Sequence, residues 1–187
     1  MDRKRIDELL DRASGLIKSF NQYNDLGNGP CKRLFEAEYG SEEQRAVWNQ
    51  LTRSTNNHNI AIRTITLLMH DITRKFNEGE ISQIHALHAA NVFRDTQQTS
   101  PPATPAHLQL LQETSQARRA DARLCEQQLR AAVQSLEGYL PEATRYRDQE
   151  GVVYQRAREQ LQMYNDSLQG APGALQGTGT GLYVAFA

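Results

Sequence analysis

Apolar or nearly apolar residues recur at alternating steps of three and four between Ser41 and Phe76, without a break in register. This spacing keeps one stripe along one side of an α-helix, as in coiled coils. The stripe consists of Trp48, Leu51, Thr55, His58, Ile62, Ile65, Met69, Ile72 and Phe76. Ser41 and Gln44 together form a capping box, which marks a helix start. The spacing therefore predicts a helix of about 36 residues, about 54 Å long at 1.5 Å per residue.

The run from Thr52 to Asn59 is the weak point of this predicted helix. It is rich in Ser, Thr and Asn residues, whose side chains bond to nearby backbone and compete with helix formation. Two interpretations are open. Either the helix continues, because the stripe keeps its register across the run, or two shorter helices meet at a break or kink near Asn56.

An elongated bundle of three main helices is predicted for residues 1–98. The first helix spans Asp2 to Tyr23, and a short helix from Cys31 to Tyr39 leads into the long one. A turn at Asn77 to Glu80 then reverses the chain into a helix from Ile81 to Gln97. The stripe of the first helix contains Ile6, Leu9, Ala13, Leu16, Phe20 and Tyr23.

A Pro-rich linker at residues 99–105 follows the bundle. Thr104 suits the N-cap of the next helix, and Pro105 suits its first position. We therefore expect a domain boundary in this linker.

Residues 106–169 are predicted to form an antiparallel coiled-coil hairpin. Gly138 and Pro141 break the helical pattern, and a second arm then runs from Pro141 to Gln169. This hairpin would place Leu129 opposite Gly151, Cys125 near Tyr154 and Ser115 near Tyr164. Polar residues in its stripe, such as Arg118, leave little apolar area to bury. A protein partner is therefore expected, with Arg118, Leu161 and Tyr164 among the residues that bind it.

Residues 170–187 have the Gly-rich composition of a flexible tail. The tail ends in an apolar, strand-prone segment, which favours docking by strand addition or in a groove. The residues expected to dock are Leu182, Tyr183, Val184 and Phe186. A tail that docks nowhere is the alternative.

Charge and composition exclude several classes of function. The formal net charge is -1, from 21 basic and 22 acidic residues, so nucleic-acid binding is not expected. Cys31 and Cys125 fit no metal or redox spacing, and no apolar run is long enough to cross a membrane. We expect a protein of the cytoplasm, or of a particle assembled there.

A histidine cluster is the best candidate for a metal site. If the turn at Asn77 to Glu80 forms, His70 faces His85 and His88. Asp71 lies beside His70, and such ligands suit zinc or iron. The spacing is not that of helix-borne zinc motifs, so a structural role for these residues is favoured and no bound metal or cofactor is expected.

Neither a nucleophile with its base nor a phosphate-binding glycine turn is recognisable in the sequence. The leading hypothesis is therefore a non-catalytic, all-α structural or adaptor subunit that acts through protein association or self-association. No small-molecule substrate is indicated. Two alternatives are open, namely a metal-binding enzyme or sensor that uses the histidine cluster, and a small effector or inhibitor that binds one host protein.

Overall fold

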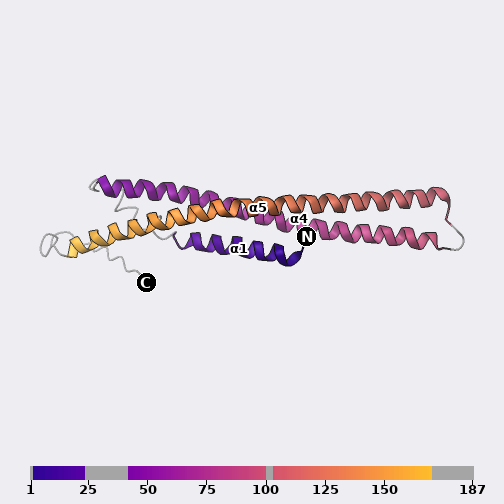
Figure 1. Cartoon of the computed structure of the whole chain (residues 1–187), viewed down its shortest axis with the longest axis horizontal. Helices are drawn as coiled ribbons and strands as arrows, with labels where there is room; N and C mark the ends of the chain where they lie inside the picture. Colours follow the sequence, from indigo (N-terminus) through magenta and orange to yellow (C-terminus); the bar gives the residue numbers. More distant parts are fainter. Residues whose placement is uncertain (1, 24–41, 100–102, 170–187) are drawn as a thin grey trace, which may run out of the picture. The chain divides into compact units, whose positions relative to one another are not determined.

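The computed structural model describes residues 2–23, 42–99 and 103–169 (Figure 1). These residues form three α-helices and no strand, which confirms the all-α class. The helices are α1 (Arg3–Asn21), α4 (Glu42–Gln97) and α5 (Pro105–Gln169). The helix predicted at residues 31–39 and the tail from residue 170 lie outside the described residues.

The chain divides into two compact units. Unit 1 comprises Met1–Ala13 and Thr64–Pro141, and unit 2 comprises Ser14–Arg63 and Glu142–Ala187. Each unit takes residues from both sides of the Pro-rich segment at which the sequence predicted a domain boundary. Each unit therefore contains a part of α1, of α4 and of α5.

The turn predicted at Asn77 to Glu80 is wrong, because α4 continues through it as one helix of 56 residues. Gly79 is buried in the packing against α5, and a Cβ atom added to it would lie 3.9 Å from the Cβ of Cys125. A glycine that faces a neighbouring helix is compatible with a helix interior, at a cost of about 1 kcal/mol relative to alanine. Gly79 therefore marks a helix contact and not a chain reversal.

Gly79→Ala is expected to raise the free energy of unfolding by about 0.5–1 kcal/mol, because the new methyl group meets Cys125 at an ordinary distance of 3.9 Å. Urea denaturation followed by circular dichroism measures the change. Gly138→Ala is the matched control, since Gly138 is exposed on a helix with nothing within 4 Å of the added Cβ. A loss of stability in Gly79→Ala alone would contradict a continuous helix at this position.

The polar run from Thr52 to Asn59 is also helical, so the predicted alternative of a break near Asn56 is wrong. The Thr55 hydroxyl donates a hydrogen bond to the carbonyl oxygen of Leu51 at 2.9 Å, one turn earlier in the helix. A side chain that bonds to its own helix in this way does not interrupt the backbone ladder.

The hairpin predicted around residue 140 is wrong as well. α5 runs through Pro141 as one helix of 65 residues (Figure 1). An internal proline costs about 3 kcal/mol. Leu136 and Leu140 before it and Ala143 after it are buried, and burial of a Leu side chain gains about 1.5–3 kcal/mol. Packing on both sides of Pro141 thus outweighs the lost backbone hydrogen bond.

Cys125, which the predicted hairpin placed near Tyr154, contacts α4. In unit 1, Cys125 Sγ lies 3.5 Å from Ser82 Oγ, and Lys75 Nζ donates to Gln128 Oε1 at 3.1 Å. Since a higher number on α4 meets a lower number on α5, the two helices run antiparallel in unit 1. The chain therefore reverses its direction between the end of α4 and the start of α5.

Side-chain caps begin α1 and α5. Thr104 was the predicted N-cap of α5, whereas Ser41, the other predicted N-cap, lies outside the described residues. The carboxylate Oδ1 of Asp2 accepts a hydrogen bond from the Lys4 amide at 3.1 Å. The Thr104 hydroxyl accepts one from the His107 amide at 3.4 Å, at the start of α5. Local side-chain chemistry is enough to place both starts.

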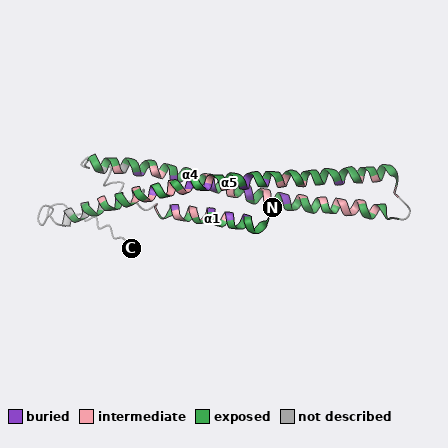
Figure 2. Cartoon of the chain, viewed as in Figure 1, coloured by how far each residue is buried: buried purple, intermediate pink, exposed green. Residues whose placement is uncertain are grey.

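Buried residues recur at every seventh position along α4 and α5 (Figure 2). We number these columns as position a of a heptad running from a to g. On α4, position a is occupied by Leu51, His58, Ile65, Ile72 and Gly79, all buried. On α5 it is occupied by Leu129, Leu136, Ala143, Glu150 and Ala157, all buried. The long helices therefore follow a coiled-coil period.

In unit 1, α1 lies against both long helices. The Arg3 guanidinium lies 5.6 Å from the centroid of the Phe76 ring on α4. Arg5 forms a 2.9 Å ion pair with Glu137 on α5, next to the fully buried Val133. Phe76 and Val133 occupy position e, and Glu137 occupies position b. α1 thus packs on the e side of the α4 and α5 pair.

Candidate functional site

Unit 2 contains a buried histidine and glutamate pair. His58 Nδ1 on α4 lies 2.9 Å from both carboxylate oxygens of Glu150 on α5. The two side chains are 2% and 3% exposed. Phe20 of α1 packs edge-on against the imidazole, with ring centroids 5.0 Å apart. Three helices therefore enclose one polar contact.

Burial perturbs both groups of the pair. It raises the pKa of Glu150 to about 8 and lowers the pKa of His58, because each charged form loses hydration. The short contact needs one shared proton, carried either by Nδ1 or by the carboxyl group. In the described residues no buried side-chain nitrogen or oxygen lacks a hydrogen-bond partner. The pair is thus satisfied internally, and its burial leaves no opening toward a substrate.

The heptad register gives this pair a structural role. Within unit 2, His58 and Glu150 are the only polar residues among the buried residues described at position a, and they meet each other. A slip of one helix by one heptad would place each of them beside an apolar side chain. Unpaired buried polar groups are costly, and a single polar residue in a coiled-coil core can specify register. The pair therefore favours one alignment of α4 with α5 in unit 2.

The sequence interpretation included His58 in a predicted stripe but missed Glu150. The predicted break at Pro141 interrupted the period of α5 just before this residue. Reading the period through the proline places Glu150 midway between Ala143 and Ala157, in a buried column. That continuity was the available signal.

The structure does not bring the candidate metal ligands together. His70 is exposed, and α4 separates it from His85 by fifteen residues, which is about 22 Å along a helix. Asp71 instead accepts a 2.7 Å hydrogen bond from Arg74. No group of three or more potential ligands capable of holding a metal ion occurs in the described part of the chain.

The predicted protein-binding residues differ in how far the structure describes them. Arg118 lies on α5 in unit 1 and forms an ion pair with Asp121 at 3.9 Å. Leu161 and Tyr164 belong to α5, but their side chains are outside the described part. The docking residues Leu182, Tyr183, Val184 and Phe186 lie outside the described residues.

A second candidate site lies on what we call the arm, residues 81–97 of α4 and 105–128 of α5 in unit 1. Ser115 is the one buried residue among those described in the arm (Figure 2). Large apolar side chains are exposed instead. The arm thus buries far less than the part of unit 1 that packs against α1.

Most exposed large apolar side chains of the described helices share position c of the heptad. They are Ile60, Leu67, Ile81, Leu110, Leu124 and Val152, each between 53% and 60% exposed. In an antiparallel pair, positions c and g of both helices lie on the same side, opposite position e. In unit 1 this is the side away from α1.

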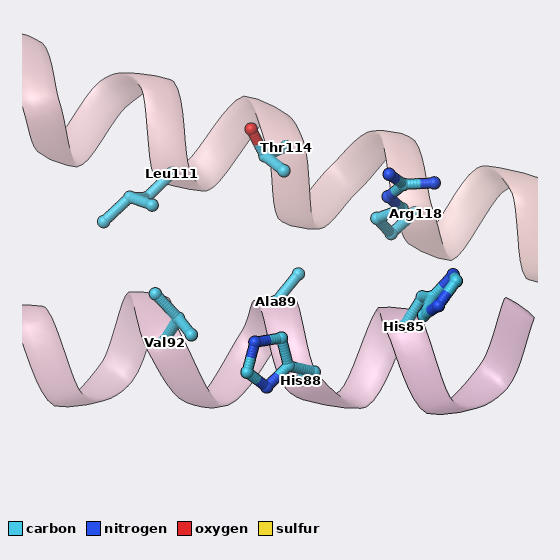
Figure 3. Close-up of a pocket in the computed structure, with 7 residues that line it drawn as sticks. All are labelled: His85, His88, Ala89, Val92, Leu111, Thr114 and Arg118. Carbon is cyan, nitrogen blue, oxygen red and sulfur yellow. The ribbon is translucent and has the colours of Figure 1, made fainter.

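A groove of about 290 Å³ opens on this side of the arm. Figure 3 shows Ala89 of α4 across from Thr114 of α5, and His85 across from Arg118. His88, Val92 and Leu111 complete the lining. These residues occupy positions c, d and g, so the groove and the exposed column at position c form one surface.

No family model, curated protein or solved structure matches the chain. None of the described helices combines the length and apolar character that a membrane span requires. The two candidate sites therefore depend on geometry alone.

Proposed function

We propose that the protein is a non-catalytic helical subunit that acts through protein association, as a structural or adaptor component of a larger assembly. The arm carries this proposal. Almost none of its residues are buried, and it exposes large apolar side chains at position c, including Ile81, Leu110 and Leu124. Two ordered helices that bury so little apolar area gain little against their ordering entropy, and a partner would supply the missing burial.

The chemistry of the described residues supports a role in association. The one buried acid and base pair, His58 with Glu150, is closed on all sides by its own helices. The arm carries no comparable pair and presents an apolar groove. Such a subunit would work in the cytoplasm or in a particle assembled there.

Light scattering and amide hydrogen exchange on the purified full chain test this function. Arm amides are expected to exchange quickly in dilute protein and more slowly once a partner or second copy covers them. Amides from Leu129 to Leu140, in the part packed against α1, serve as the internal control and stay protected. A monomer whose arm is as well protected as that control would contradict the proposal.

A further inference from the structure

We infer that the partner of the arm is a second copy of this chain, docked face to face on the surface formed by positions c, d and g. We call this surface the c face; it comprises only the residues at positions c, d and g within residues 81–92 of α4 and 110–125 of α5. The inference rests on the proposed association function and names its partner. The complex would be a two-fold dimer in which two helical pairs make a four-helix bundle.

The charge of the c face fits a copy of itself. Its only Arg, Lys, Asp or Glu side chains are Arg118 and Asp121, which pair with each other at 3.9 Å. The face therefore offers no net charge of one sign to attract an acidic or basic partner. A two-fold interface brings the same patch together from both chains, so an unbalanced charge would repel. This face avoids that penalty.

The apolar residues of the c face also suit self-association. Position c carries Ile81 on α4 and Leu110, Ala117 and Leu124 on α5, all exposed. α5 thus supplies an outward apolar column, and α4 adds Ile81 beside His88, the other residue at position c in this range. Side chains spaced by heptads on two such pairs can interdigitate as they do in four-helix bundles.

The available area is sufficient for a specific dimer. In unit 1 the column at position c extends the face to Leu67 on α4 and Ala131 on α5, a length of about 35 Å. With two helices side by side, about 20 Å wide, a dimer would bury about 1,400 Å² in total, which is within the range of specific interfaces. The charges of this extension at positions c, d and g balance. Arg74 is paired with Asp71 at 2.7 Å and Glu78 at 3.7 Å, and Lys75 donates a hydrogen bond to Gln128 at 3.1 Å.

Sedimentation velocity of the full chain from about 1 to 100 μM tests this partner. The wild type is expected to shift from monomer to dimer over that range. Leu110→Glu and Leu124→Glu are each expected to weaken the dimer at least about tenfold, because they place a charge in the apolar column. Leu87→Glu is the matched control and should dimerise normally, since Leu87 is 64% exposed but lies at position b.

Other outcomes overturn the inference and separate it from the proposed function. If dimers persist in Leu110→Glu and vanish when residues 170–187 are deleted, the C-terminal segment carries the association in place of the c face. If the wild type stays monomeric while the amides of its arm exchange quickly, the partner is not a second copy of the chain. The proposed function would still stand in that case. Loss of helicity in Leu110→Glu is checked by circular dichroism, with Leu124→Glu as the independent variant.

Discussion

His58→Leu is expected to lower the free energy of unfolding by about 3–5 kcal/mol at neutral pH, because it leaves the Glu150 carboxyl buried without its partner. Glu150→Leu should cost less, about 1–3 kcal/mol, since a neutral imidazole is easier to bury than a carboxylate. Urea denaturation measures both changes. His70→Leu, an exposed histidine on the same helix, is the control and should change stability by less than about 0.5 kcal/mol.

The double variant His58→Leu with Glu150→Leu separates pairing from burial. Two apolar side chains of similar volume replace the pair without leaving an unsatisfied group, so most of the lost stability should return. If the double variant instead loses the sum of both single effects, the two residues do not act as a pair. Restored stability would also show that the pair serves mainly to align α4 with α5 in unit 2 and adds little to the free energy of unfolding.

The second large effect is a dependence of stability on pH between about 6.5 and 8. Burial raises the pKa of Glu150 from 4.5 to about 8 and lowers the pKa of His58 from 6.5. Between pH 4.5 and 6.5 the folded pair holds one proton, and so do the two side chains together in the unfolded chain. The pair therefore does not make the free energy of unfolding depend on pH in this range. Above 6.5 the unfolded histidine loses its proton while the folded pair keeps one.

Stability from the pair should therefore fall as pH rises from 6.5 to 8, by about 2 kcal/mol in total. Below 4.5 the unfolded glutamate gains a second proton, so stability should fall in that direction too. Unfolding of the wild type and of the double leucine variant in the same buffers isolates the effect, because all other groups cancel. Parallel profiles of the two proteins would contradict it.

Local pattern was sufficient to predict helical structure and the start of α5. The stripe through His58 and Ile65 predicted a long helix, and the structure buries both residues in α4. Thr104 and Pro105 predicted the start of α5. Such features depend on a few neighbouring residues and on helical periodicity, which are written in the chain.

Local sequence pattern did not predict where the chain reverses or which residues of different helices contact one another. Gly79 and Pro141 are turn signals by intrinsic propensity, yet both lie inside helices. Whether such a residue ends a helix depends on the apolar area that neighbouring helices bury on either side of it. That gain belongs to the assembled helices and is absent from any short window of sequence.

The sequence by itself thus determined the helical class, the heptad period and the buried position of His58. Only the tertiary structure decided that the chain reverses between α4 and α5. Because α4 continues through Gly79, His70 stays apart from the ligands predicted to join it, and in unit 2 it is Glu150 that meets His58. Periodicity sets the side of a helix on which a residue lies, whereas its partner is set by long-range packing.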